Sequence, residues 1–487
     1  MGEKLSEEHR PKVLVAGAGG SIGSVVSRSL ARKYEVVALV GSREQLQESK
    51  PGLSLSWRFC EPFSRQDVET AITGCDYIIY LVNTRVRTAR QDQAECEDMD
   101  LLIADNVARA ASHQGVKQII YLGWIIQEGN VSLGLLERRN EVIEALSFYG
   151  TPLTVLRAGL VIAPGSNTVR LLANTATRLP IVLVPQWAAN KRQQPIALID
   201  VIRAIRFCLG NDETKNNDYD IGGPQVLTYR EMLQSAADVL KKKQIIINVP
   251  FLPARLYRRY LHLLDRHAHP ALIRLIVEDL GHDSVVRSNP VQKHIETAAV
   301  LPRKVIDPYM KKWAQLPPNP RQSFFKEYIA GLRSKSNVRS IQRLDLPPGR
   351  NATWVAETYF QWLPRFSRLL VICEVDGTGT CRYYNRFPRL HLLTLSFRQE
   401  FSSPDRRMYF ITEGLLARGH DDLTPRLEFR DVLNGRYTIA ALHDFMPVLP
   451  WGLYFVTQAL VHLIVMRNFQ KYIAKMLPGS SQKNLTG

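Results

Sequence analysis

Three glycines near the start of the chain stand at a spacing that can hold a phosphate group. Gly17, Gly20 and Gly23 form a GxxGxxG pattern inside the segment VLVAGAGGSIGSVV at residues 13–26. Glycines let a backbone approach a pyrophosphate, and the amide groups at the start of a helix face the anion. An ordinary tight turn is the alternative, and the flanking elements decide between the two.

The flanking residues predict a strand before the glycines and a helix after them. Residues 13–16 are a short apolar run without polar alternation, which is typical of a buried parallel strand. Apolar residues then recur at helical spacing from Ile22 to Leu30, and a second apolar strand follows at residues 34–40. A β-α-β unit of about 30 residues favours a dinucleotide cradle over a simple turn.

The residues after the second strand predict which dinucleotide is bound. Folds that bind NAD usually place Asp or Glu there to hold the ribose hydroxyls. This chain has Gly41, Ser42 and Arg43 instead. A small residue, a hydroxyl and a guanidinium suit the 2′-phosphate of NADP, so NADP is expected rather than NAD. A solvated arginine in a surface loop is the alternative.

Length and composition limit the class of protein. A chain of 487 residues is too long for one core and predicts two or three domains. The net charge of +17 is spread along the chain, with concentrations in RLYRRYLHLLDRH and LPRKVIDPYMKKW. It favours attraction to an anionic surface. No nucleic-acid-binding motif accompanies it, so we expect peripheral membrane contact rather than specific binding of nucleic acid.

The cysteines and the N-terminal segment indicate the compartment. The six cysteines lack CxxC spacing and clustered histidines, which predicts reduced core thiols and no metal site. The first residues, MGEKLSEEHRPK, are polar and do not form a signal peptide. A cytoplasmic protein, peripheral to a membrane at most, is the expectation.

Alternating strand and helix patterns continue beyond the first unit. Strands are predicted at residues 75–82, 117–123 and 153–162, with helices at 99–115 and 137–150. This alternation predicts an α/β fold with a doubly wound parallel sheet, which binds ligands at the carboxyl ends of its strands. The pattern loosens from about residue 164, where we expect a substrate lobe within a first domain of residues 1–313.

A second domain is predicted after a proline-rich linker at residues 314–329. Five segments then read as antiparallel strands, and a long helix follows from about Pro450 to Met476. These elements predict an α+β helix-grip domain over residues 330–480, with a tail at 481–487 and an apolar cavity. The apolar part of the helix has about 16 residues, short for a membrane span, and is expected to be a buried lid.

These segments together resemble the atypical, extended short-chain dehydrogenase/reductase group of the NmrA-like kind. The resemblance is to its bacterial two-domain members with a C-terminal START-like (SRPBCC) domain. It rests on segments that cover nearly the whole chain in the expected order: GAGGSIG at 17–23, YLVNT at 80–84, LRAGLVI at 156–162, QPIALIDV at 194–201, YDIGGPQVLTYREM at 219–232 and the tail LPWGLYFVTQALVHLIVMRNFQKYI.

The resemblance implies a Rossmann domain that binds NAD(P) through named residues. Arg43 would lie near the adenosine ribose, Glu61 beside the adenine, and Arg139 near the ribose or nicotinamide. Asn106 would be structural, tying two strands together. The remaining implied cofactor contacts are Gly17, Gly19, Gly20, Ser21, Ile22, Gly23, Val82, Asn83 and Thr84.

The chain departs from the family at the expected catalytic residues. Such reductases use a tyrosine as proton donor, a lysine four residues later and a serine that polarises the carbonyl. Leu135 stands at the tyrosine position and Arg139 at the lysine position, with Gly123 and Trp124 near the expected serine. Arg139 is the weak catalytic candidate, because a guanidinium that stays protonated is a poor proton donor.

Other titratable residues are weaker catalytic candidates. Tyr121 lies inside a predicted strand and is expected in the core. Glu137 and Glu141 are one helical turn apart and are expected to be solvated. His443 and Asp444 end the last predicted strand; they either face the cavity or are satisfied core residues.

Two functions from different classes remain. One is an NADP-dependent oxidoreductase acting on a hydrophobic carbonyl or quinone-like substrate, which is the general character of the group. The other is a non-catalytic NADPH sensor or assembly factor that presents a lipid-like ligand or partner through the C-terminal domain. The missing tyrosine and serine favour the second, and the glycine loop is consistent with both.

Overall fold

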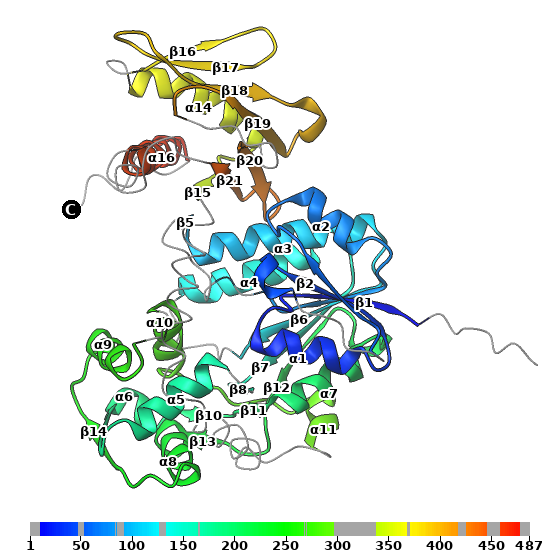
Figure 1. The fold of residues 1–487 in the computed structure, drawn as a ribbon, viewed down its shortest axis with the longest axis vertical. Helices are drawn as coiled ribbons and strands as arrows, with labels where there is room; N and C mark the ends of the chain where they lie inside the picture. The colour runs from blue at the N-terminus through cyan, green and yellow to red at the C-terminus, as the bar shows by residue number, and fades with distance from the viewer. Residues whose placement is uncertain are drawn as a thin grey trace, which may run out of the picture. The chain divides into compact units, whose positions relative to one another are not determined.

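The chain folds into two compact units in the computed structural model (Figure 1). The first unit contains residues 1–86 and 103–318, and the second contains residues 87–102 and 319–487. The structure describes residues 10–46, 53–82, 84, 92–125, 133–163, 166–266, 268, 270–296, 338–367, 371–416, 425–445 and 458–477. The linker predicted at 314–329 lies outside these residues.

The first unit is built on a parallel sheet of seven strands. Their order is β12-β7-β6-β4-β1-β2-β3, and every neighbouring pair is parallel. The chain order reverses between β1 and β4, which is the switch point where such sheets bind ligands. The bounds are β1 Lys12–Ala16, β2 Glu35–Val40, β3 Leu55–Phe59, β4 Tyr77–Tyr80, β6 Gln118–Trp124, β7 Leu153–Ala158 and β12 Asn217–Ile221. The predicted doubly wound parallel sheet is confirmed.

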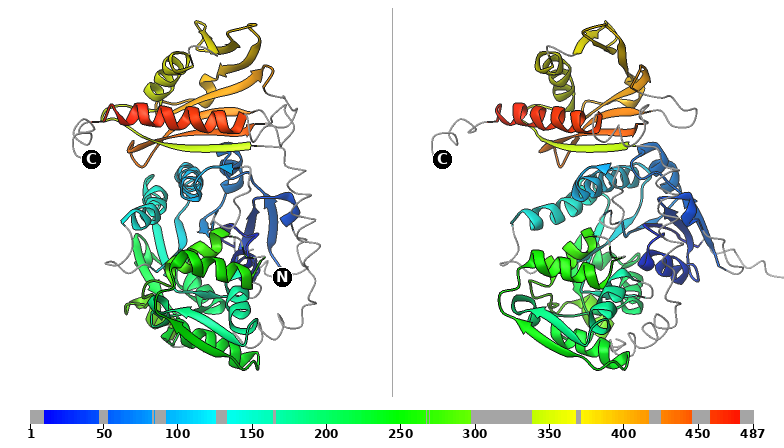
Figure 2. Two further views of the ribbon diagram at one scale, coloured as in Figure 1. Left: turned by 90° about the vertical axis from the view of Figure 1, so that its left-hand side faces the viewer. Right: turned by 60° about the vertical axis from the view of Figure 1, so that its left-hand side comes forward.

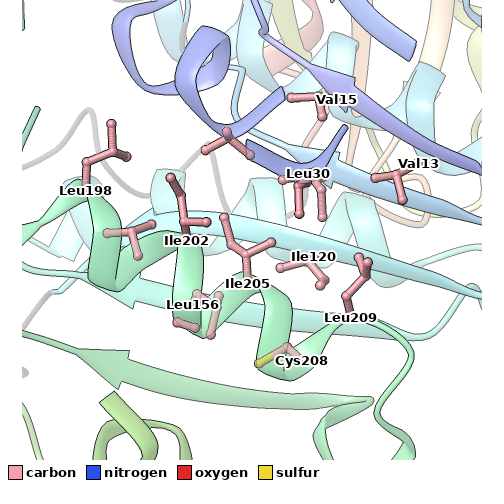
Figure 3. Close-up of a cluster of buried hydrophobic side chains, with 14 of the residues drawn as sticks. Val13, Val15, Leu30, Ile120, Leu156, Leu198, Ile202, Ile205, Cys208 and Leu209 are labelled. Carbon is pink, nitrogen blue, oxygen red and sulfur yellow. The ribbon is translucent and has the colours of Figure 1, made fainter. Parts of the chain in front are cut away.

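Helices cover both faces of this sheet. On one face lie α1 (Ser21–Leu30) and α7 (Leu198–Cys208); Figure 3 shows Ile202 and Ile205 of α7 directed at strand residues such as Ile120. On the other face lie α2 (Arg65–Ile72), α3 (Cys96–His113) and α4 (Leu133–Ser147). Burial of apolar residues on both faces explains why the strands are continuous hydrophobic runs.

The strand predicted at 153–162 is correct for residues 153–158 only, because the chain leaves the main sheet after them. β7 ends at Ala158, and β8 (Val161–Ile162) pairs with β11 (Ile196–Ala197) in a separate small sheet. The break falls at Gly159, where a Cβ atom would lie 2.1 Å from the carbonyl oxygen of Gln194. Only glycine allows this close approach of two backbones.

Beyond β8 the first unit forms a lobe with its own hydrophobic cluster. A two-stranded parallel ribbon, β9 (Ile181–Pro185) with β14 (Ile245–Val249), forms one part of the lobe. The remaining lobe elements are α5 Asn167–Thr177, α6 Gln186–Ala189, β10 Arg192–Gln193, β13 Leu227–Thr228, α8 Tyr229–Val239, α9 Ala254–Leu264 and α10 Pro270–Asp279, and α11 Pro290–Glu296 packs against α7.

The second unit is an eight-stranded sheet with helices on one face (Figure 2). The strand order is β16-β17-β18-β19-β20-β21-β15-β5, antiparallel except for the terminal pair of β15 and β5. The helices are α14 (Ala352–Phe366) and α16 (Gln458–Ala474). The strands are β5 Asp92–Gln93, β15 Val338–Asp345, β16 Val371–Val375, β17 Cys381–Asn385, β18 His391–Phe397, β19 Arg406–Glu413, β20 Arg426–Val432 and β21 Tyr437–Phe445.

Aromatic side chains fill the space between the sheet and its helices. Tyr359 of α14 and Phe469 of α16 lie 5.0 Å apart by ring centroid, and Tyr359 lies 5.7 Å from Phe429 of β20. The expected burial of the last helix is only half correct. Phe469 and Ile473 are buried, but Val461 on the other side of α16 is exposed. The START-like assignment and the cavity stay predictions.

Within the described residues, no helix is long and apolar enough to cross a membrane.

Candidate functional site at the carboxyl ends of the first sheet

The glycine loop between β1 and α1 lies tight against its surroundings at two positions. Gly17 has φ +87°, and a Cβ atom there would lie 2.8 Å from the carbonyl oxygen of Leu81, just after β4. A Cβ atom on Gly23 would lie 2.3 Å from the carbonyl oxygen of Gly17. These contacts require glycine and hold the loop at the switch point of the sheet.

Gly20, in contrast, faces open space at the start of α1. A Cβ atom there would have one neighbour, the Gly17 carbonyl oxygen at 3.5 Å. Gly20 is the N-cap of α1, no side chain caps the helix, and its first turn has no acidic residue. The first hydrogen bond of the helix runs from the Ser24 amide to the Gly20 oxygen (3.0 Å). The amides of Ser21, Ile22 and Gly23 therefore come before the first i→i−4 hydrogen bond of the helix. This uncapped helix start fits a pyrophosphate.

Gln45 borders the same loop, which the sequence analysis did not foresee. It ends the short helix η1 (Arg43–Gln45) after β2, and a Cβ atom on Gly19 would lie 2.5 Å from its Oε1. Gly19 therefore leaves room for the Gln45 amide rather than for a ligand. Nothing in the residue pattern pointed to this side chain, because its direction depends on how η1 turns.

Arg43 lies beyond the end of β2, at the start of η1. Its side chain is exposed, and its guanidinium carbon lies 5.2 Å from the ring centroid of Phe59 at the end of β3. A guanidinium over an aromatic face is held in position, and its N–H groups that point away from the ring can still donate hydrogen bonds. The pair offers a guanidinium to a phosphate and a ring to a flat base.

The other cofactor residues implied by the resemblance have mixed positions. Val82 follows β4 and is half-buried beside Gly17, and Thr84 is buried. Glu61 follows β3, and its carboxylate accepts the Phe63 amide at 3.5 Å. Asn83 lies outside the described residues.

Asn106 has a structural role, though not between two strands. It is fully buried in α3, and its side-chain amide donates to the Pro62 carbonyl at 2.9 Å. It ties the helix to the loop that follows β3, so it holds the segment that carries Glu61.

Tyr121 places a phenol near the end of β6. A Cβ atom on Gly123 would lie 3.1 Å from Cε1 of Tyr121 and 3.5 Å from its hydroxyl oxygen, so the ring runs along the strand toward its carboxyl end. Tyr121 is half-buried, with its ring centroid 5.9 Å from that of Tyr80, rather than in the core as expected. Ile120 packs on the α1–α7 face, so Tyr121 and Gly123 point to the opposite face.

The helix that should carry the catalytic pair is α4. Leu135, Glu137 and Arg139 lie in it, but their side chains are outside what the structure describes. Glu141 is buried, with 4% of its surface exposed, so the expectation of a solvated carboxylate there is wrong.

His443 and Asp444 are satisfied core residues, as one of the two alternatives predicted. His443 is fully buried, and its Nε2 lies 3.0 Å from Oε2 of Glu428. Burial lowers the pKa of His443 to about 4, so the neutral ring donates from Nε2 to the carboxylate. Asp444 accepts from Arg426 at 2.6 Å. His443 pairs with Arg426 in the register, on the side of the sheet opposite Phe429 and the helices.

The described cysteines are chemically quiet in the first unit. Cys60, Cys75 and Cys208 are buried free thiols, and burial raises their pKa values to about 12, 11 and 12. Thiols in this state are poor nucleophiles and poor metal ligands. Across the described ranges, no group of three His, Cys, Asp or Glu side chains is placed to hold a metal ion.

Comparison with known proteins agrees with this geometry. Residues 17–146 match a family model described as NAD(P)H-binding. The segment begins at Gly17 and includes the glycine loop, Arg43 and Tyr121. The first unit therefore carries an NAD(P)H-binding domain of the Rossmann type.

Two curated relatives match parts of the chain. The Auxiliary protein GraX of Staphylococcus aureus is 29% identical over 143 residues, 29% of this chain and 42% of the relative. A mitochondrial NADH dehydrogenase [ubiquinone] 1 alpha subcomplex subunit 9 of Arabidopsis thaliana is 21% identical over 248 residues, 49% of this chain and 60% of the relative. The chain thus spans less than two thirds of either.

Two solved structures align with about three fifths of the chain. A Citrobacter triphenylmethane reductase complexed with NADP(H) aligns with TM-score 0.48 and 17% identity, covering 61% of this chain and 99% of the other. An Escherichia coli NADPH-dependent quinone oxidoreductase complexed with NADPH aligns with TM-score 0.49 and 15% identity, covering 62% and 100%.

Proposed function

We propose that this chain is an NADPH-dependent oxidoreductase in which Tyr121 gives a proton to a hydrophobic carbonyl or quinone-like substrate. The observation that carries the proposal is the phenol of Tyr121 beside Gly123, where the resemblance to short-chain reductases puts the polarising serine. This phenol would be a proton donor on strand β6, whereas the tyrosine position of the family, Leu135 in this chain, lies in helix α4.

The cofactor half of the proposal is NADP rather than NAD. The open start of α1 suits the pyrophosphate, and exposed Arg43 beyond β2 suits a 2′-phosphate, with no acid at Gly41 or Ser42 to repel it. Gly17 and Val82 would hold the dinucleotide against the end of β4, Glu61 would lie beside the adenine, and Arg139 near the nicotinamide ribose. When bound, the reduced nicotinamide supplies a hydride.

The protein's own part in the reaction is to position the substrate and to give it a proton. A phenol is protonated at neutral pH and can donate to an oxygen that gains negative charge. General acids of this kind contribute about 10²- to 10⁴-fold to a rate. Tyr121 would be re-protonated from solvent, which its half-buried position permits.

The test is anaerobic oxidation of NADPH with a panel of hydrophobic aldehydes and quinones, comparing wild type with Tyr121→Phe. We expect NADPH binding by the variant to be unchanged and turnover to fall about 100-fold. Tyr219→Phe is the matched control, because Tyr219 is also half-buried on the same sheet, in β12, and donates to the Glu213 carbonyl. Full activity of Tyr121→Phe would remove Tyr121 from the mechanism.

A second candidate is a non-catalytic NADPH-binding assembly factor. It is favoured by Leu135 and Arg139 at the family's tyrosine and lysine positions, and by the names of the two matched relatives, an auxiliary protein and a subunit of a larger complex. Tight NADPH binding with no turnover across the panel would support it.

In either case we propose that the second unit holds a lipid-like ligand, which native mass spectrometry of the full chain tests.

A further inference from the structure

The lobe of the first unit carries large apolar side chains on its surface. In the ribbon of β9 and β14, Ile181 pairs with Ile245 and Leu183 with Ile247, so all four share one face. Ile245 is 64% exposed, and Ile181 and Ile247 are also exposed. The other face, with Val182, Val184 and Ile246, is buried in the lobe core. One side of this ribbon is therefore unpartnered in the described lobe.

Helix α9 continues the same surface. Its buried stripe is Tyr257, Leu261 and Leu264, while Leu256 and Leu263 are exposed on one flank. Tyr260, which lies between them at helical spacing, accepts the Leu183 amide at 3.3 Å. That bond sets the Leu256–Leu263 flank beside the exposed face of the ribbon, and Figure 1 shows α9 and β14 along one side of the lobe.

Phe251 is the most exposed large apolar residue of this surface. It precedes α9 and is 94% exposed. Its backbone is nevertheless held, because Trp187 donates from its indole nitrogen to the Leu252 carbonyl at 2.8 Å. An aromatic ring that projects into solvent from a held backbone is suited to insertion into another apolar phase.

Cations surround these apolar residues. Lys241, Lys242 and Lys243 are exposed shortly before β14, and Arg255 and Arg259 in α9 and Arg266 just after it are also exposed. Between residues 241 and 266 the acidic side chain is Asp265, which is buried and bonded to Arg170. Exposed aliphatic and aromatic residues with lysines and arginines beside them in the chain match the interface of an anionic bilayer.

We propose that this lobe surface docks on membranes that contain anionic lipids, with Phe251 and the exposed residues of β14 and α9 entering the headgroup region. The charge complementarity commits the surface to lipid rather than to a second copy of the chain, since two such surfaces would bring like charges together. The proposal stands apart from the chemistry at Tyr121.

The test is sedimentation of the full-length protein with vesicles of phosphatidylcholine, alone or mixed about 3 to 1 with phosphatidylglycerol. We expect binding to the mixed vesicles that weakens as salt is added, and little binding to phosphatidylcholine alone. Phe251→Asp should lower the partition coefficient at least about tenfold. Each of the single variants Lys241→Gln, Lys242→Gln and Lys243→Gln should lower it about fivefold.

Phe387→Asp is the matched control. Phe387 is 89% exposed in the β17–β18 connection of the second unit and also lies next to an arginine, Arg386, in the sequence. The control should bind like wild type. Equal loss in both Phe variants, or no vesicle binding by wild type at low salt, would overturn the proposal. If Phe251→Asp instead converts a dimer to a monomer in sedimentation velocity, the surface is an interface between copies.

Discussion

Gly20, the N-cap of α1, and Gly23, in the first turn of that helix, lie three residues apart, but substitutions at them should have different effects. The space beside Gly20 is open, so Gly20→Val should fold normally and lose NADPH binding, because its side chain fills the space for the pyrophosphate. Gly23→Ala puts its Cβ atom against backbone, so it should lower the free energy of unfolding by about 2 kcal/mol. Calorimetric titration and denaturant unfolding separate the two effects. Normal NADPH binding by Gly20→Val would place the pocket elsewhere.

Arg43 should decide between the two dinucleotides. Wild type should bind NADPH at least about tenfold tighter than NADH, which needs about 1.4 kcal/mol from one charge-assisted contact. Arg43→Ala should remove this preference, measured by calorimetry with both cofactors. Arg58→Ala, an exposed arginine in β3, is the control and should keep it. A wild-type preference for NADH would contradict the assignment.

At this scale the sequence was informative where a residue type is required by the backbone. Gly17 and Gly23, where a Cβ atom would meet backbone, were identified from their spacing together with the strand and helix that flank them. Gln45 and Tyr121 were not, because their roles depend on where a side chain points after η1 has turned or along the end of β6. Burial of Glu141 was also missed, since helical spacing does not show which face another element covers.

Among the elements, the strands β19, β20 and β21 carry a buried ionic group that should make stability depend on pH. Glu428 accepts from Arg406 at 2.6 Å, Arg430 at 2.7 Å and His443 at 3.0 Å. The arginines hold the pKa of Glu428 well below its usual range, while burial lowers that of His443 to about 4 from 6.5. Both groups therefore stabilise the fold in their deprotonated forms.

The free energy of unfolding should therefore decrease as the pH is lowered. The His443 contribution is complete above pH 6.5 and is lost as the pH falls toward 4, an effect of roughly 3 kcal/mol. The Glu428 contribution is lost only below its ordinary pKa of 4.5. Denaturant unfolding at several pH values measures this slope. His443→Gln should make this slope shallower between pH 6.5 and 4.5 without abolishing it, because burial also lowers the pKa of His462 to about 4, and exposed His262→Gln should leave it unchanged. A slope unchanged in His443→Gln would refute this origin.

Elements with strong periodicity were predictable, and short or polar ones were not. The alternation in the first 160 residues gave the parallel sheet, because buried parallel strands are continuous apolar runs. β17, with the sequence CRYYN, has no such run, and the break after β7 depends on the distant Gln194 carbonyl. α16 was expected to be buried. An apolar composition does not show whether other elements cover one face of a helix or both.

On the scale of the whole molecule, the second unit is assembled from two separate stretches of chain. Residues 92–93 form β5, which pairs with Arg339 and Ser340 of β15. Asp98 also belongs to this unit and accepts from Arg343 Nε at 2.8 Å and from its terminal nitrogen at 2.7 Å. A domain of residues 330–480 was expected from sequence, and no local pattern shows that residues 87–102 join it.

The Asp98–Arg343 pair should contribute measurably to this assembly. Both side chains are mostly buried, so Arg343→Met leaves a carboxylate without its cation and should lower the free energy of unfolding by about 3 kcal/mol. Adding Asp98→Asn should recover part of the loss in a double-mutant cycle. Arg382→Met breaks the more exposed pair with Asp376 and should cost under about 1 kcal/mol. Equal losses in the two single variants would contradict the prediction.

The division of the second unit has a consequence for its synthesis. Asp92 leaves the ribosome roughly 10 to 50 s before Arg339, its partner in the sheet, at ordinary elongation rates of about 5–20 residues per second. The nascent chain must therefore carry residues 92–93 without their strand partners while the rest of the first unit is made. During this interval they offer unpaired backbone groups to any other nascent strand, which makes this segment a natural place for a chaperone to bind.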